Sequence, residues 1–135
     1  MRATTIGLFL GALSVGLAGC GGVGERTAAA REAAVGFEAA LSASDTHRAC
    51  EALAPGTLEE LESDQPCPAA LAALDLGTVT DSGQPVATDV YGDQARVVFA
   101  GDVVYLASFP DGWKVTAAGC TPRPGRPARC EVQGS

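Results

Sequence analysis

The stretch Leu17-Ala18-Gly19-Cys20 closes a short apolar run at the start of the chain and decides which part of it can fold as a domain. Arg2 supplies one positive charge, and the apolar run from residue 6 to residue 17 is shorter than the roughly 20 residues of a membrane-spanning helix. Small residues before a cysteine at this position are typical of a bacterial lipobox. We therefore expect residues 1–19 to be a lipoprotein signal peptide. Ordinary secretion with Cys20 as a fifth thiol, or a short uncleaved anchor, is the alternative.

Cleavage before Cys20 would make this residue the lipid-bearing start of the mature chain. Two acyl chains contribute about 0.8 kcal/mol per buried methylene and hold a protein stably where one does not. This predicts a protein anchored to the cell membrane through the lipid on Cys20, on the extracytoplasmic face. The glycine-rich residues 20–25 would serve as a flexible tether. Residues 26–135 are then expected to form a single domain, because a chain of this length suits one hydrophobic core.

The charge of the mature chain excludes one class of partner. The whole chain has 9 basic and 16 acidic residues, and removal of residues 1–19 takes away only Arg2, so the net charge falls from −7 to −8. A nucleic-acid-binding protein needs a basic surface, so we expect no nucleic acid as partner. Attraction to anionic lipids is equally unfavourable, and the anchoring must come from the acyl chains.

The remaining four cysteines are an even number in an exported small domain, which indicates disulfide bonds. Three pairings are possible. We favour Cys50 with Cys67 and Cys120 with Cys130, because each closes a local loop around irregular, proline-containing chain. We expect no metal site, since there is no C-x-x-C motif and His47 is the only histidine. No cofactor is expected either.

The first half of the domain has the spacing of helices. Apolar residues recur every three or four positions over residues 28–43, which predicts a helix. Ser44 or Asp45 would cap a second helix that Pro55 ends. The sequence Thr57-Leu58-Glu59-Glu60 fits a capping box at the start of a third. Pro68 would begin a fourth, which runs through residue 74.

The second half has the alternation of strands. Residues 86–91, 94–100, 103–109 and 113–118 are rich in Val, Phe, Tyr, Trp and Thr and are separated by Gly-Asp and Pro-Asp-Gly turns. Apolar residues on both faces predict that the middle strands are covered on both sides. The fold class is therefore α+β, with N-terminal helices packed on a curved, cone-like, four-stranded antiparallel meander.

Several of these segments carry a family resemblance. They are the lipobox, the alanine-rich helix with Phe37, residues 49–55 with Pro66-Cys67, and Asp111-Gly112-Trp113-Lys114-Val115 followed by Ala118-Gly119-Cys120. Together they resemble lipoproteins of unknown function from GC-rich (actinobacterial-type) Gram-positive bacteria. The order of elements is similar to the nuclear transport factor two-like (SnoaL-like) superfamily. The resemblance implies that Trp113 packs in the final hairpin of a cone-shaped sheet, and it implies no particular activity.

Candidate catalytic groups have simpler structural explanations. His47 follows a polar helix start, where a solvated surface position is expected. Asp93 and Asp102 follow glycines in turns, where aspartate is favoured for backbone reasons. Trp113, Tyr105 and Tyr91 are candidates for contact with a ligand or partner, although packing on the sheet explains the tyrosines equally well. The acidic residues 51–64 are expected to form a solvated helix face rather than a calcium site.

The segment between Cys120 and Cys130 is chemically distinctive. Arg123, Arg126 and Arg129 recur every three residues among prolines, and polyproline II has three residues per turn. We therefore expect a disulfide-closed C-terminal loop whose three guanidinium groups face one way and bind an anionic envelope component or protein partner. The alternative is that the loop folds back on the domain's own acidic helices.

Three functions fit these features. The first is a non-enzymatic binding or accessory module held on the membrane. The second is a small-molecule sensor or carrier that uses a cone-shaped pocket near Trp113 and Tyr105. The third is an enzyme of the isomerase or cyclase type, for which the sequence offers no credible acid–base pair.

Overall fold

The computed structural model describes residues 22–76 and 83–134. The expected signal peptide and Cys20 lie outside the described residues. Within them, the helices are either too short or too polar to cross a bilayer.

The helices come first in the chain, as predicted. They are α1 (Val23–Ser42), α2 (Thr46–Glu51), α3 (Pro55–Leu61) and α4 (Cys67–Ala73). Helix α1 begins five residues before the predicted start, within the segment expected to be a tether, and the Glu25 carboxylate accepts a hydrogen bond from the Gly22 amide at 3.1 Å. Asp45 caps α2 by accepting a hydrogen bond from the backbone amide of Arg48. This agrees with one of the two predicted caps.

The capping box at Thr57 is wrong. Helix α3 begins at Pro55, a favourable first position because proline has no N–H to satisfy there. Thr57 is therefore inside the helix and buried, and its hydroxyl donates to the backbone carbonyl of Thr116 at 3.0 Å. Helix α4 begins at Cys67, one residue before the predicted Pro68.

The sheet has five antiparallel strands in the order β1-β2-β3-β4-β5. They are β1 (Ala87–Tyr91), β2 (Gln94–Val98), β3 (Val103–Phe109), β4 (Gly112–Arg123) and β5 (Arg126–Gln133). The α+β class is confirmed, but the prediction of four strands was one too few, because β4 continues to Arg123 and a further strand follows it. The sheet is not closed, and β1 and β5 form its edges.

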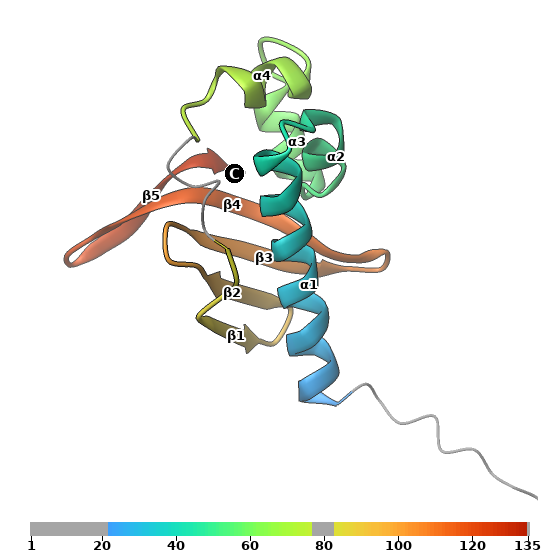
Figure 1. Ribbon diagram of the computed structural model, residues 1–135, viewed down its shortest axis with the longest axis vertical. Helices are drawn as coiled ribbons and strands as arrows, with labels where there is room; N and C mark the ends of the chain where they lie inside the picture. The colour runs from blue at the N-terminus through green and yellow to red at the C-terminus, as the bar shows by residue number, and fades with distance from the viewer. Residues whose placement is uncertain (1–21, 77–82, 135) are drawn as a thin grey trace, which may run out of the picture.

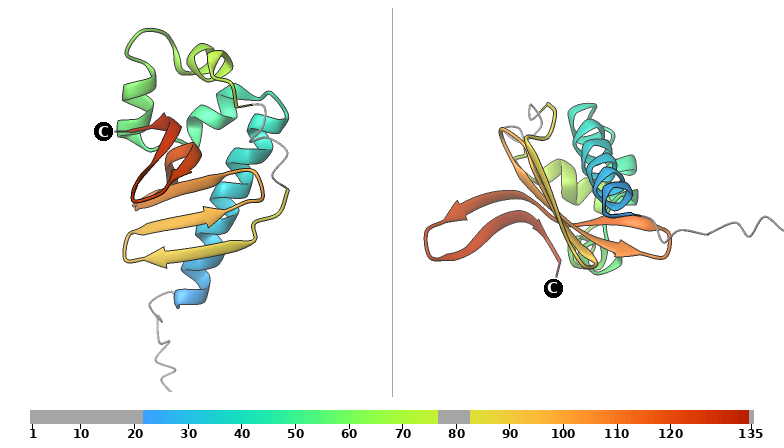
Figure 2. Two further views of the ribbon diagram at one scale, coloured as in Figure 1. Left: turned by 90° about the vertical axis from the view of Figure 1, so that its left-hand side faces the viewer. Right: turned by 90° about the horizontal axis from the view of Figure 1, so that it is seen from below.

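The core lies between α1 and one face of the sheet (Figure 2). Phe37 of α1 is fully buried, and so are Val97, Val104 and Val115 of the sheet. These strand residues share a face, since Val97 is opposite Val104 and Val115 is opposite Leu106 in the register. The other face is only partly covered. The middle strands are therefore covered fully on one face and in part on the other, where full cover on both was expected.

Strand β4 joins the helices to the sheet. Its first half pairs with β3 on one edge, while Val115 exchanges hydrogen bonds with Ala52 and Ala54 on the other at 2.9 and 2.8 Å. The register with β3 shifts at Thr116. The carbonyl of Thr116 accepts hydrogen bonds from the Thr57 hydroxyl and from the Gly134 amide, which binds α3 and the end of β5 to the same point.

The disulfide between Cys50 and Cys67 joins α2 to the start of α4. Both cysteines are buried, and the connection between the two helices carries acidic residues that remain exposed. This pairing is the one that the sequence favoured.

Candidate functional site

The second disulfide closes a hairpin that projects from the body of the molecule (Figure 1). Cys120 of β4 lies directly opposite Cys130 of β5 in the strand register, so the bond crosses between neighbouring strands. The turn consists of Pro124 and Gly125, and Gly125 has a φ of +66°. Proline followed by a residue with positive φ is the pattern of a type II turn.

The segment expected to form a polyproline II loop is therefore a two-stranded ribbon. The prediction of a loop rather than a strand rested on Pro122 and Pro127, because proline cannot donate a hydrogen bond to a strand ladder. Both lie within the stretch where the register of β4 and β5 shifts, between Thr121 and Arg123. Pro127 also belongs to an edge strand, where a missing donor is tolerated.

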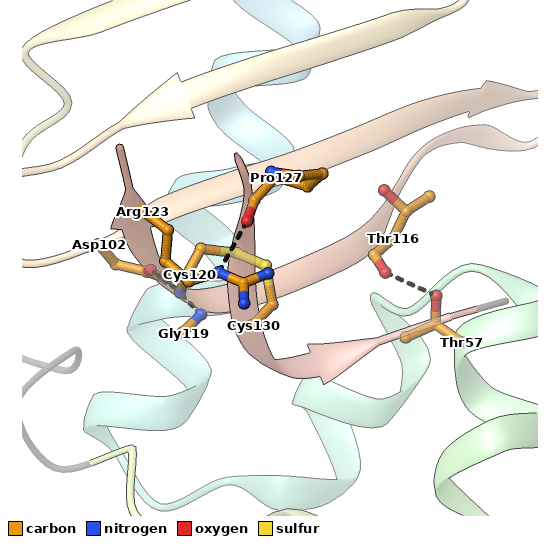
Figure 3. The surroundings of a disulfide bond; sticks show 8 residues. All are labelled: Thr57, Asp102, Thr116, Gly119, Cys120, Arg123, Pro127 and Cys130. Carbon is orange, nitrogen blue, oxygen red and sulfur yellow. Dashed lines mark hydrogen bonds between the residues drawn. A yellow bond between two sulfur atoms is a disulfide. The ribbon is translucent and has the colours of Figure 1, made fainter. Parts of the chain in front are cut away.

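The base of this hairpin is held by Asp102, which is only 4% exposed. One carboxylate oxygen accepts a hydrogen bond from the Cys120 amide at 2.8 Å and the other accepts one from the Gly119 amide at 3.0 Å (Figure 3). The regular pairing of β3 with β4 ends at Tyr105 and Ala117. Just beyond that point, the Asp102 carboxylate accepts hydrogen bonds from backbone amides of β4 that no longer pair with β3. Asp102 is thus a structural residue of the site, whereas the sequence identified it only as a turn aspartate.

The three arginines lie at the outer end of the ribbon. Arg123 is opposite Arg126, and Arg129 is opposite Thr121. All three arginines are exposed, and within the described residues their one side-chain hydrogen bond runs from Arg123 Nε to the carbonyl of Pro127 at 3.0 Å. The predicted single row of guanidinium groups at every third residue does not form, because the turn places two of them on facing strands.

The hairpin arginines are not neutralised by carboxylates of the described residues. Ion pairs there join Arg26 to Asp93, Arg96 to Asp89 and Lys114 to Asp111. The alternative in which this segment folds back on the acidic helices is therefore wrong for the described part of the chain. The hairpin presents positive charge on a protein whose net charge is negative.

A groove of about 480 Å³ runs beneath the hairpin on the sheet face that points away from α1. Its lining combines the side chains of β2, β3 and β4 with those of β5. Tyr105, Gln94, Thr116, Gln133, Pro127 and Cys130 are among the residues that form it. Polar and apolar groups both contribute to this lining, and the groove is open to solvent.

The aromatic candidates do not meet in one pocket. Tyr105 lines the groove, whereas Trp113 is on the opposite face and packs against the core beneath the guanidinium group of Arg26, which lies 5.6 Å from the ring centroid. Tyr91 is at the end of β1 and is exposed. The predicted cone-shaped pocket near Trp113 and Tyr105 is absent from the described residues, because buried side chains fill the space between α1 and the sheet.

Other candidate groups are distributed over the surface and the core. His47 is exposed on α2, and Asp93 is exposed in its turn. No cluster of possible metal ligands occurs within residues 22–76 and 83–134. Glu38 is 4% exposed on α1 and was missed by the sequence analysis. Its position four residues after the buried Ala34 is the signal that could have located it on the inner face of the helix.

Comparisons with models of protein families, with curated proteins and with solved structures gave no match for this chain.

Proposed function

We propose that this protein is a lipid-anchored, non-enzymatic binding module on the extracytoplasmic face of the cell membrane, and that its β4–β5 hairpin binds a phosphate-bearing chain of the cell envelope. The anchoring rests on the lipobox and Cys20, and the cell envelope follows from it. The single observation that carries the binding function is the exposed group Arg123, Arg126 and Arg129, which no described carboxylate neutralises.

The chemistry of these residues favours phosphate. A guanidinium group offers planar, paired N–H donors that match two oxygens of one phosphate or carboxylate group. Arg126 and Arg129 are three residues apart on an extended strand, which corresponds to about 10 Å. A linear chain with repeated phosphates can span Arg129 and the facing pair Arg123 and Arg126, whereas an isolated small anion reaches either that pair or Arg129.

The arrangement of the hairpin supports a binding role more than a catalytic one. Two backbone hydrogen bonds to Asp102 and a disulfide fix its base, so the arginines are held on a prearranged ribbon. Prearrangement reduces the entropy lost on binding. The open groove beneath the hairpin adds the Tyr105 hydroxyl and the amides of Gln94 and Gln133 as groups that can contact the same chain.

The relationship to the nuclear transport factor two-like superfamily belongs to this proposal. Helices followed by an antiparallel sheet agree with the order of elements that the superfamily implies. It contributes no substrate and no reaction to the proposed function.

The experiment that tests the binding function uses the mature chain with Cys20→Ser, so that the protein is soluble. Replacing Arg123, Arg126 and Arg129 by Gln should weaken binding to a poly(glycerol phosphate) chain by about tenfold, since exposed charge pairs contribute roughly 0.5 kcal/mol each. A control with Arg26, Arg31 and Arg48 replaced by Gln, all on α1 and α2, changes the net charge equally. Equal loss in both variants, or binding to polyglutamate as tight as to the phosphate chain, would contradict the proposal.

The anchor has its own test. The protein with its native Cys20 should float with membranes in a density gradient, and the Cys20→Ser protein should stay in the soluble fraction. Mass spectrometry of the mature amino terminus should find the acylated cysteine. Membrane association of the Cys20→Ser protein without detergent would overturn this part of the proposed function.

A further inference from the structure

The exposed large apolar side chains of the described residues gather at one end of the molecule. Val23 is 78% exposed in the first turn of α1, Val86 is 71% exposed just before β1, and Tyr91 is 66% exposed at the end of β1. Figure 1 shows the start of α1 and the edge strand β1 together at this end, with α4 at the other. Single exposed apolar residues are ordinary, but their concentration at one end of a molecule indicates a contact surface.

Two of these residues belong to one groove. Val23 and Val86 line a groove of about 500 Å³ between the first turns of α1 and the start of β1, together with Thr27, Ala28, Arg31 and Pro85. The groove is formed by elements that are far apart in the sequence. Arg31 donates a hydrogen bond to the side chain of Gln84 at 3.2 Å, which holds its guanidinium group at the rim.

The chain leads directly from this end to the proposed site of lipidation. Cys20 precedes Val23 by three residues, and extended chain spans at most about 3.6 Å per residue. A lipid on Cys20 would therefore hold the first turn of α1 within roughly 11 Å of the lipid headgroups. Helix α1 leaves no room for a long spacer between the anchor and the domain, since it begins at Val23.

We propose that this end, defined by Val23, Val86 and Tyr91 and named here the seating surface, rests on the lipid bilayer and sets the orientation of the domain. This inference rests on the proposed lipidation of Cys20. The occupant is the boundary between headgroups and acyl chains, where valine side chains enter the apolar layer and the ring of a tyrosine takes its usual interfacial position.

Electrostatic attraction to the headgroups does not hold the seating surface on the bilayer. Arg26 is paired with Asp93 and Arg96 with Asp89, while the Glu25 carboxylate binds the Gly22 amide. Arg31 and Glu32 add one charge of each sign on the neighbouring turn of α1. The seating surface is therefore nearly neutral, and we expect its contact with lipid to be the same in zwitterionic and in anionic vesicles.

Because of the anchor, even a weak contact between the seating surface and the bilayer is sufficient to orient the domain. Because the lipid on Cys20 already holds the domain at the membrane, contact of the seating surface is an intramolecular event with a high effective concentration. In this orientation α1 extends away from the bilayer. Strand β1 lies nearest the lipid, and the other strands follow at increasing distance in the order of the sheet. The arginine hairpin projects to one side, at a distance from the headgroups (Figure 1). A hairpin in that position reaches material of the envelope rather than the lipids beneath the domain.

The test uses a single tryptophan as a probe of lipid contact. Trp113→Phe removes the native tryptophan, and Val86→Trp places one on the seating surface. The matched control in the same background is Ala69→Trp, at an exposed position of α4 at the far end. Lipidated proteins are reconstituted in phosphatidylcholine vesicles, with and without phosphatidylglycerol, whose acyl chains carry bromine as a quencher.

The tryptophan at position 86 should lose most of its fluorescence and shift its emission to shorter wavelength in both vesicle types, and the tryptophan at position 69 should do neither. Equal emission of the two variants in vesicles that carry the protein would overturn the seating surface while leaving the anchor intact. Failure of the unmodified protein to float with the vesicles would overturn the lipid anchor and this inference with it.

A second measurement avoids the substitutions. Hydrogen exchange of the lipidated protein without substitutions, bound to vesicles, should be slower at the first turn of α1 and along the edge of β1 than in the soluble Cys20→Ser protein. Exchange in α4 should be the same in both. Unchanged exchange at α1 and β1 in protein that floats with the vesicles would contradict the proposal.

Discussion

The carboxylate of Asp102 and the backbone amide of Cys120 meet where β4 leaves β3, with 2.8 Å between Oδ1 and N. The second oxygen binds the Gly119 amide, so Asp102→Asn would set an amide NH₂ group against a backbone N–H. We expect this variant to lose about 2 kcal/mol in the free energy of unfolding, measured by urea denaturation. Asp93→Asn, in the corresponding turn but with a side chain that is 87% exposed, should change it by less than about 0.5 kcal/mol. Equal losses would contradict a structural role for Asp102.

The hydroxyl of Thr57 and the carbonyl of Thr116 connect α3 to the shift of register in β4. Thr57→Val keeps the shape of this 1% exposed side chain and removes the hydrogen bond. We expect a loss of about 1 kcal/mol in the free energy of unfolding, because the carbonyl retains its bond to the Gly134 amide. Thr121→Val, at an exposed position of β4, is the control and should have little effect. A neutral Thr57→Val variant would show that the hydroxyl bond contributes nothing.

The two disulfides should differ in what their removal changes. Each closes a short loop, and the chain-entropy model gives about 3 kcal/mol for a loop of this size. Cys50→Ala with Cys67→Ala removes a bond that lies in the core, so we expect hydrogen exchange to increase throughout α2 and α4. Cys120→Ala with Cys130→Ala should increase exchange mainly in β5 and weaken binding of the phosphate-bearing chain. Identical exchange patterns for the two double variants would exclude this division.

The elements that depend on local sequence were predictable. Apolar residues at spacings of three and four located α1. The Gly92-Asp93 turn located the β1–β2 hairpin, and the Pro110-Asp111-Gly112 turn located the β3–β4 hairpin. The disulfide pairing followed because each pair closes a local loop. In these cases the spacing of apolar residues, the turn residues or the cysteines themselves mark the feature in the sequence, and such a pattern can be recognised directly.

The features that no local pattern distinguishes were missed. Strand β5 forms because it pairs with β4, and proline content alone indicated irregular chain. Thr57 has the spacing of a cap, but its hydroxyl binds a residue 59 positions away. Asp102 has the position of a turn residue, and its two partners are 17 and 18 positions away. No local signal separates these residues from ordinary caps and turns.

Gly119 and Gly125 provide a comparison that isolates the cost of crowding at the base of the hairpin. Both have a φ of +66°, a conformation that costs an alanine about 1 kcal/mol. A Cβ on Gly125 meets nothing within 4 Å, whereas one on Gly119 would lie 2.9 Å from Leu76 Cδ2 and 3.2 Å from Glu131 Cβ. We therefore expect Gly125→Ala to lose about 1 kcal/mol in the free energy of unfolding and Gly119→Ala to lose roughly 1–3 kcal/mol more.

Urea denaturation of the two glycine variants measures this difference directly, because the backbone term cancels between them. The Gly119 amide is also one of the two donors to Asp102, so exchange of the Cys120 amide should be faster in Gly119→Ala and unchanged in Gly125→Ala. Equal stability of the two variants would mean that Leu76 and Glu131 move aside without cost. The base of the hairpin would then be loosely packed, and it would not hold the exposed arginines in a fixed position.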